Sequence, residues 1–287
     1  MRQSKELQHE RQEERLDYLL HAFKEDSVRY KGLDAGESYQ EKRQLLRSLM
    51  NIRMPGAMSR DVMRVQDEFL AEEAQEKGII TLSDIPTAAE QYGSAHPFAG
   101  QISIWQGDIT RLKVGAIVNA ANAQMLGCFV PCHGCIDNAI HSAAGIELRE
   151  ACSYYMNRKK MQYGSRYEEP TGKAVLTKGY NLPSEYVIHT VGPIVAGELN
   201  HKLKDDLRNC YQNVLKCCRE HRIRSVAFCC ISTGEFHFPK DEASKIAVNT
   251  VTEFLKEHKP DFDRIIFNVF KDADRVLYEK RLAPMFN

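Results

Sequence analysis

The stretch 117–145, IVNAANAQMLGCFVPCHGCIDNAIHSAAG, indicates the fold of this chain. It begins as a strand, because residues 116–118 form a short apolar run rich in β-branched side chains. It ends as a helix, because apolar residues recur at helical spacing over 136–144. Three cysteines and one histidine lie in the loop between them. In α/β proteins a strand, a small-residue loop and a helix N-terminus commonly bind an anionic ligand such as a diphosphate.

The composition of the whole chain restricts the number of domains, the kinds of partner and the cellular compartment. The 287 residues suit one large domain or two smaller ones. Lys+Arg and Asp+Glu both number 39, and this balance argues against a nucleic-acid or anionic-membrane partner. No apolar run approaches membrane-spanning length, and the N-terminus does not resemble a secretory signal. The nine cysteines, an odd number, favour free thiols in a reducing compartment, so we expect a cytoplasmic protein.

Residues 1–95 are predicted to form a helical N-terminal extension. Leucines and a phenylalanine recur at helical spacing over 16–23, a second stripe spans 45–49, and Ser59 is placed to cap a third helix. Pro55 and Gly56 end the second helix. No catalytic constellation occurs here. The extension is expected to pack on the main domain, and the alternative is a lid that recognises substrate.

Residues 96–287 are predicted to form an α/β domain with a mixed, mostly parallel sheet and helices on both faces, because strand and helix patterns alternate. The expected strands are 101–106, 117–119, 174–177, 186–191, 226–231 and 265–269. The expected helices are one from Asp137, one at 203–219, one at 241–256 and a closing one, with a polar insertion at 155–170. The ligand should lie at the carboxyl ends of the strands.

The loop 128–135 has the composition of a metal site. Thiolates and an imidazole this close together suit zinc, and three protein ligands would leave a fourth position open. Spacing alone does not exclude Cys132. One alternative is a flexible loop without metal. Another is a zinc-stabilised scaffold with a closed tetrahedron, for which Cys132 is the nearby candidate for the fourth ligand.

Four motifs in the right order resemble the macrodomain family over roughly residues 98–287. They are GDIT at 107–110, IVNAAN at 117–122, YVIHTVGP at 186–193 and ISTGEFHFP at 231–239. Macrodomains bind ADP-ribose, and many hydrolyse it from proteins. The chain is most similar to the zinc-dependent macrodomains, bacterial protein-ADP-ribose hydrolases with a helical N-terminal extension. These are often encoded beside a sirtuin-type ADP-ribosyltransferase and a lipoylated carrier protein. The departure from other hydrolytic macrodomains is the loop 127–135, which stands in place of a run of glycines.

The resemblance implies a role for each matching residue. The implied ligands of one zinc ion are Cys128, His133 and Cys135. The implied catalytic residues are Asp137, which orients or deprotonates the attacking water, and Asn122, which holds the distal ribose. The implied ADP-ribose contacts are Asp108, Ile109, Asn122, Ser232, Thr233, Gly234, Glu235 and Phe236. Asp108 would accept from the adenine amino group, residues 232–234 would cradle the diphosphate, and Phe236 would pack on the distal ribose.

Several positions keep a second interpretation. Asp108 has the alternative of a turn or helix cap. Phe270 fits an adenine-stacking position and equally a place in the core. Glu235 is an unusual carboxylate beside phosphate, so it is expected to point elsewhere, toward the metal or the scissile bond. Asn119 is expected to bond local backbone. The histidines interpreted as structural are His141, His189 and His237.

The leading functional prediction is a zinc-dependent hydrolase that cleaves the glycosidic bond between ADP-ribose and a protein side chain. Its expected partners are ADP-ribose and mono-ADP-ribosylated protein, with a lipoylated carrier protein as the candidate target. The competing prediction is a non-catalytic module that recognises ADP-ribose. The metal loop and Asp137 weigh against that module, because binding alone needs neither.

Overall fold

The computed structural model describes residues 2–283, and for residues 2–7 and 9 it describes only the course of the backbone. A six-stranded sheet runs through the centre of the main domain in the order β2-β8-β7-β4-β6-β5. All neighbours are parallel except the edge strand β5, which is antiparallel to β6. The strands are β2 (Ile102–Gln106), β4 (Ala116–Ala121), β5 (Ala174–Lys178), β6 (Tyr186–Val191), β7 (Ser225–Phe228) and β8 (Arg264–Val269). The predicted fold class is confirmed.

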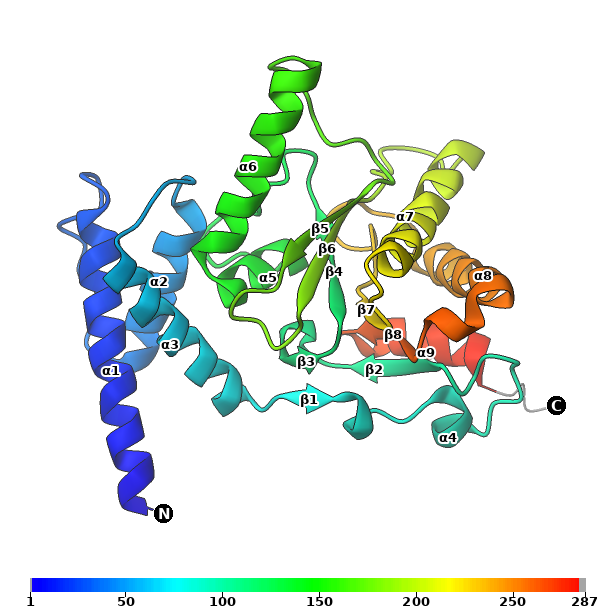
Figure 1. Cartoon of the computed structure of the whole chain (residues 1–287), viewed down its shortest axis with the longest axis horizontal. Coiled ribbons are helices and arrows are strands. Elements are labelled where there is room, and N and C mark those ends of the chain that lie inside the picture. The colour runs from blue at the N-terminus through cyan, green and yellow to red at the C-terminus, as the bar shows by residue number, and fades with distance from the viewer. Residues whose placement is uncertain (1, 284–287) are drawn as a thin grey trace.

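Helices cover both faces of the sheet (Figure 1). One face is covered by α5 (Ile136–Ala144) and α6 (Ile146–Tyr163). The other is covered by α7 (His201–Glu220), α8 (Lys240–His258) and α9 (Asp272–Leu282). Because helices cover both faces of the parallel strands, nearly every residue of β4, β6, β7 and β8 is buried, and most of these residues are apolar.

The predicted polar insertion at 155–170 is wrong for its first half, because α6 continues to Tyr163. Gly145, with φ of 94°, ends α5, and a new helix starts at the next residue. Leu148, Cys152 and Met156 recur every four residues along α6 and are buried, so an apolar stripe holds this otherwise polar helix on the sheet.

The N-terminal extension is a bundle of three helices beside α5 and α6 (Figure 1). These are α1 (Arg2–Glu25), α2 (Tyr39–Ile52) and α3 (Arg60–Lys77). The stripe predicted over 16–23 is buried with leucines of α2, with Phe69 and with Ile146 of the main domain. Ser59 caps α3 as predicted, accepting a hydrogen bond from the Val62 amide.

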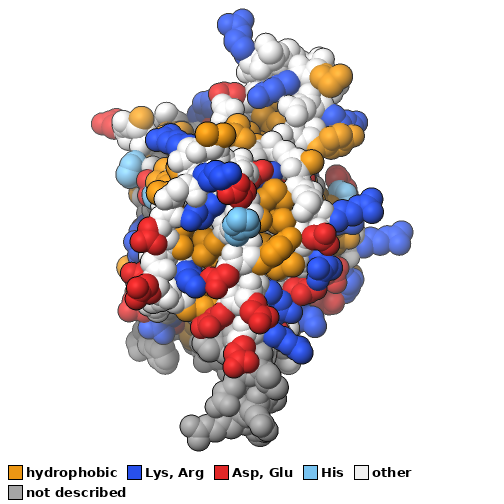
Figure 2. All heavy atoms as spheres, turned by 90° about the vertical axis from the view of Figure 1, so that its left-hand side faces the viewer, with side chains coloured by type: hydrophobic (Ala, Val, Ile, Leu, Met, Phe, Trp, Pro, Cys, Tyr) orange, Lys and Arg blue, Asp and Glu red, His pale blue; other side chains and the backbone are white. Residues whose placement is uncertain are grey.

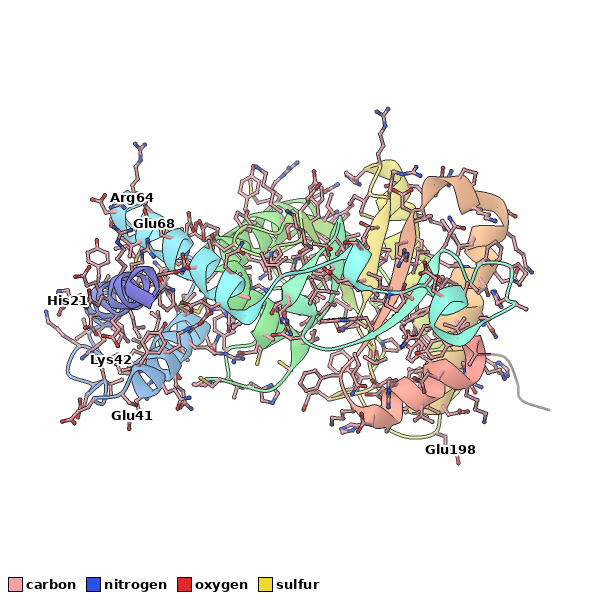
Figure 3. The ribbon with its side chains drawn as sticks, turned by 90° about the horizontal axis from the view of Figure 1, so that it is seen from below. His21, Glu41, Lys42, Arg64, Glu68 and Glu198 are labelled. Atoms are coloured by element: carbon pink, nitrogen blue, oxygen red, sulfur yellow. The ribbon has the colours of Figure 1, made fainter. Side chains whose placement is uncertain are left out.

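The outer surface of the extension is highly charged but of mixed sign. Figure 2 shows acidic and basic side chains interspersed over this side of the molecule. In Figure 3, Arg64 and Glu68 lie together on α3, where they form an exposed ion pair at 3.0 Å. Such surface pairs stabilise little, so the extension is held by its apolar core.

A short connection joins the extension to the sheet. In it β1 (Ile80–Thr81) pairs in parallel with β3 (Leu112–Lys113), and α4 (Ala88–Tyr92) follows. Ile85 and Ala88 are buried in the core of the main domain. The domain boundary expected at residue 95 stays a prediction. We propose that the boundary between the extension and the main domain lies nearer Gly78, because Ile85 and Ala88 already pack in the core of the main domain. The 3-10 helices are η1 (Leu82–Asp84), η2 (Ile109–Arg111) and η3 (Lys259–Asp261). Within residues 2–283 no helix combines the length and the apolar character needed to span a membrane.

Candidate functional site

The candidate site residues lie where parallel strands end at one edge of the sheet. Asp108 comes two residues after β2, Asn122 directly after β4, and Phe270 directly after β8. The loop 232–236 follows β7, and Gly192 follows β6. The chain therefore gathers residues from five strand ends at the edge where the ligand is expected.

Asp108 is a helix cap in this structure. Its Oδ1 accepts hydrogen bonds from the Thr110 amide at 3.0 Å and the Thr110 hydroxyl at 2.7 Å, and so begins η2. Both bonds use the same oxygen, so capping is compatible with a ligand at Oδ2. The neighbouring Ile109 is 1% exposed and packs in the core. Because its side chain is buried, Ile109 can contact a ligand only through its main chain.

The loop 232–236 is held tightly against the end of β6. Ser232 has φ of 65°, and its buried Oγ has no hydrogen-bond partner among the described residues. A Cβ added at Gly192 would lie 2.0 Å from that Oγ, so only glycine allows this approach. The Thr233 hydroxyl donates to the Cys230 carbonyl at 3.0 Å, whereas Gly234 and Glu235 are exposed. The loop is thus anchored at its start and open at its tip.

Phe270 is 73% exposed, which excludes the alternative of core packing. Phe236 is half-buried, and its carbonyl accepts from the Val195 amide at 2.9 Å. Both rings are aromatic surfaces at the ligand edge of the sheet.

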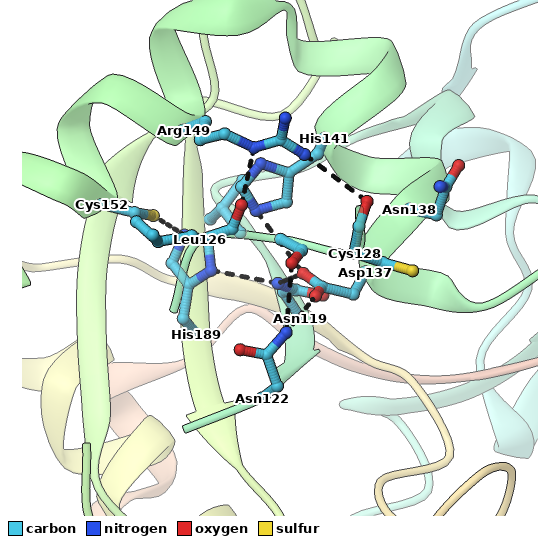
Figure 4. A network of polar contacts seen from close by, with 12 residues as sticks. Asn119, Asn122, Leu126, Cys128, Asp137, Asn138, His141, Arg149, Cys152 and His189 are labelled. Carbon is cyan, nitrogen blue, oxygen red and sulfur yellow. Dashed lines mark hydrogen bonds and ion pairs between the residues drawn. The ribbon is translucent and has the colours of Figure 1, made fainter. Parts of the chain in front are cut away.

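Asp137 is at the centre of a buried polar network (Figure 4). It is 5% exposed and accepts from Asn119 Nδ2 at 2.8 Å and from Asn122 Nδ2 at 3.4 Å. Asn122 Nδ2 also donates to the Gly127 carbonyl at 3.1 Å. Burial raises the pKa of Asp137 to about 6, while the Asn119 hydrogen bond and the charge of Arg149 oppose this. The expectation that Asn119 bonds local backbone is wrong, because its amide donates to this carboxylate.

Two buried histidines lie beyond Asp137. His189 Nε2 is 3.0 Å from the Thr177 hydroxyl, and its Nδ1 is 3.1 Å from Asn119 Nδ2. Burial lowers the pKa of His189 to about 4 and that of His141 well below its ordinary value, so both are neutral at pH 7. With Cys152 they form a buried group of donor atoms within 4.8 Å of one another that has the composition of a metal site. His237 is exposed.

The three predicted zinc donors come together in the loop 128–135. The ligand atoms of Cys128, His133 and Cys135 lie within 4.8 Å of one another, and all three side chains are partly exposed. His133 Nδ1 is buried and has no hydrogen-bond partner among the described residues. Burial raises the pKa of Cys135 to about 11, a cost that a bound cation would offset. Two sulfurs and one imidazole fit zinc.

Cys132 lies outside this group. Its Sγ is 3.3 Å from the Ser48 hydroxyl and donates to the Gln44 carbonyl at 3.4 Å, both on α2. The closed tetrahedron with Cys132 as fourth ligand is therefore not the arrangement found. Glu235 reaches toward the loop from the other side, with its Oε1 4.0 Å from His133 Nε2.

Four residues that hold this loop were not predicted from the sequence, namely Arg47, Asn51, Asn138 and Arg149. Arg47 and Asn51 come from α2, and Arg149 is 5% exposed in α6. Arg149 carried one local signal, because it is a charged residue next to the apolar stripe of its helix. The residues of α2 carried none, since their partners are more than 80 positions away along the chain.

Comparisons with known proteins agree with this fold. A profile of the Macro domain family matches residues 118–247. A protein-ADP-ribose hydrolase of Treponema medium is 41% identical over 273 residues, covering 95% of this chain and 99% of that protein. One of Staphylococcus aureus is 40% identical over 270 residues, covering 93% and 95%. The crystal structure of a Trypanosoma brucei macrodomain in complex with ADP-ribose superposes with a TM-score of 0.61 at 29% identity, covering 87% of this chain and 98% of that one.

Proposed function

This chain belongs to the Macro domain family, and on that premise we propose that it hydrolyses the bond between mono-ADP-ribose and protein side chains. The relatives named protein-ADP-ribose hydrolase support the reaction class, because the similarity spans nearly their whole length. The observation that carries the proposal is the position of Asp137. Asp137 accepts from Asn122, which directly follows β4, and Asp137 lies in the first turn of α5, directly after the loop in which Cys128, His133 and Cys135 could hold a metal.

Zinc is the proposed cofactor, with one ion per chain held by Cys128, His133 and Cys135. The orphaned Nδ1 of His133 and the two neighbouring sulfurs support this assignment. When bound, zinc supplies Lewis acidity toward an oxygen atom. Three protein ligands would leave a fourth coordination position open.

Residues of the chain are proposed to activate the attacking water and to hold the ribose. A water molecule attacks the anomeric carbon of the distal ribose, and the bond from that carbon to the protein side chain breaks with its electron pair. Asp137 accepts the proton of the water, and the leaving side chain gains a proton from solvent. Asn122 holds a ribose hydroxyl and, through its bond to the Gly127 carbonyl, fixes the start of the metal loop.

Binding of the rest of ADP-ribose is proposed for the neighbouring strand ends. Asp108 would accept from the adenine amino group through the oxygen that does not cap η2, and Phe270 would stack on the base. Residues 232–234 would receive the diphosphate, supported by the unpartnered Ser232 hydroxyl at their start. Phe236 would pack on the distal ribose, and Glu235 would face the reacting end of the ligand.

The proposed substrate is a mono-ADP-ribosylated protein. A lipoylated carrier protein modified by a sirtuin-type transferase is the specific candidate, and its support is the resemblance to the zinc-dependent subgroup. A reducing compartment such as the cytoplasm is proposed because the nine cysteines are unpaired.

The test is release of ADP-ribose from mono-ADP-ribosylated proteins, measured by mass spectrometry with and without a zinc chelator. We expect release that stops with the chelator and returns when zinc is restored. Glu198→Gln is the matched control, since Glu198 is an exposed carboxylate that points away from the molecule (Figure 3). A protein that binds ADP-ribose with zinc present, yet releases none from any modified protein, is the non-catalytic module instead.

A further inference from the structure

The helix α2 of the N-terminal extension lies directly against the metal loop. Arg47 and Asn51, one helical turn apart, both contact the loop or the start of α5. Neither points into the apolar core of the bundle, which uses Leu46 and Leu49 of the same helix. The extension therefore presents one face of α2 to its own core and another to the metal loop.

Arg47 holds one of the three proposed metal ligands directly and a second one through Asn138. Its Nη2 donates to the His133 carbonyl at 3.3 Å, and its Nη2 and Nε donate to Asn138 Oδ1 at 2.7 and 3.2 Å. Asn138 in turn donates its backbone N–H to Cys135 Sγ at 3.4 Å and its amide to the Val130 carbonyl at 2.9 Å. One guanidinium thus fixes His133 directly and Cys135 through one intermediate.

Asn51 holds the residue before His133. It is 1% exposed, its Oδ1 accepts from the Cys132 amide at 2.9 Å, and its Nδ2 donates to Ser142 Oγ at 2.9 Å. Cys132 has φ of 51°, a left-handed conformation that costs energy for a residue with a side chain. The hydrogen bond from Asn51 is one of the contacts that maintain this turn.

Arg149 ties the other end of the loop to the same helix. It donates to the carbonyls of Leu126 at 2.6 Å and Cys128 at 3.5 Å, as Figure 4 shows. It also donates to the carbonyls that end α2, those of Met50, Asn51 and Arg53. The partial negative charge of a helix C-terminus accommodates this buried cation.

We propose that Arg47 and Asn51 are positioning residues of the metal centre, so that α2 completes the site rather than only covering the domain. This inference rests on the proposed zinc ligands. The two residues contact neither a donor atom nor the strand ends where ADP-ribose is expected, so their effect is on ligand geometry. Side chains that orient metal ligands change metal affinity about 10- to 100-fold when removed.

The experiment compares Arg47→Met, Arg47→Lys and Asn51→Ala with the unaltered full chain, and uses Arg64→Met, an exposed arginine of α3, as the matched control. Zinc affinity is measured by competition with a chromophoric chelator. We expect it to weaken 10-fold or more for Arg47→Met and Asn51→Ala, less for Arg47→Lys, which retains one donor group, and not for Arg64→Met. Affinity for free ADP-ribose, measured by calorimetry, should stay within threefold throughout.

A second measurement does not require zinc. Hydrogen exchange of the metal-free protein should show faster exchange of the Cys132 and His133 amides in the Arg47 and Asn51 variants, with unchanged exchange in the sheet. If unaltered protein binds no zinc, the proposed metal site fails, and this inference fails with it. If unaltered protein binds zinc but the folded Arg47→Met and Asn51→Ala variants keep its affinity and loop protection within twofold, only the positioning role is refuted.

Discussion

The substitution Asp137→Asn separates catalysis from binding. Asparagine keeps the shape of the side chain and one acceptor oxygen, so the 2.8 Å bond from Asn119 can persist. The weaker contact from Asn122, at 3.4 Å, would then face an NH₂ group and be lost. A hydrogen bond of this kind contributes about 1 kcal/mol or less, so affinity for free ADP-ribose should fall by about fivefold at most.

The rate should fall much further. Asparagine cannot accept a proton from water, and loss of an acid–base group costs about 100-fold, or about 2.7 kcal/mol in the transition state. Release of ADP-ribose at saturating substrate gives kcat, calorimetry gives affinity, and Glu198→Gln is the control for loss of a carboxylate. A loss of kcat with affinity retained indicates an interaction made in the transition state. If Asp137→Asn turns over within fivefold of the unaltered chain, Asp137 is not the base.

Three further predictions use the same preparations. Metal analysis of fresh protein should find about one zinc per chain, lost in Cys135→Ala and kept in Cys132→Ala, whose thiol points to α2; equal loss in both would contradict the assigned ligands. Phe270→Ala should weaken ADP-ribose binding by about 1–3 kcal/mol, because its ring is proposed to stack on the adenine base, and it should not lower the melting temperature, because the side chain is exposed. In the extension, Arg43 hydrogen-bonds Glu73 and lowers its pKa from 4.5 to about 2. The lowered pKa means that the pair's stabilisation, about 3 kcal/mol, is present above pH 4.5 and is lost as the pH falls toward 2. Glu73→Gln should abolish that part of the acid dependence in circular-dichroism melts, and an unchanged pH profile would refute the linkage.

Local sequence patterns predicted the sheet well because each strand has its own apolar run. The strand expected at 186–191 has the observed bounds, and the two apolar stripes and the third helix of the extension lie where they were expected. The part of α6 after residue 155 was not predicted, because a helix with a narrow buried stripe and many exposed polar residues resembles a polar insertion.

The candidate site was predictable only where its residues follow strands. Asn122 and the loop 232–236 were found because they belong to motifs at strand ends. The contacts that shape the metal loop were not found, since Arg47 and Asn138 are 91 positions apart and neither shows its partner in the local sequence. Likewise, the bond from Asn119 to Asp137 depends on how α5 packs against β4.

The helix α2 and the metal loop are in contact but far apart along the sequence, and this has a consequence for the order of folding. During synthesis α1, α2 and α3 are made before residues 126–149, although Ile146 later joins their core, and N-terminal units generally fold first. The loop then closes contacts over a separation of more than 80 residues, which are among the slower steps in folding. The metal centre would therefore be assembled late, on a helix already in place. A newly made chain would pass through a state with a folded extension, exposed ligand thiols and no metal.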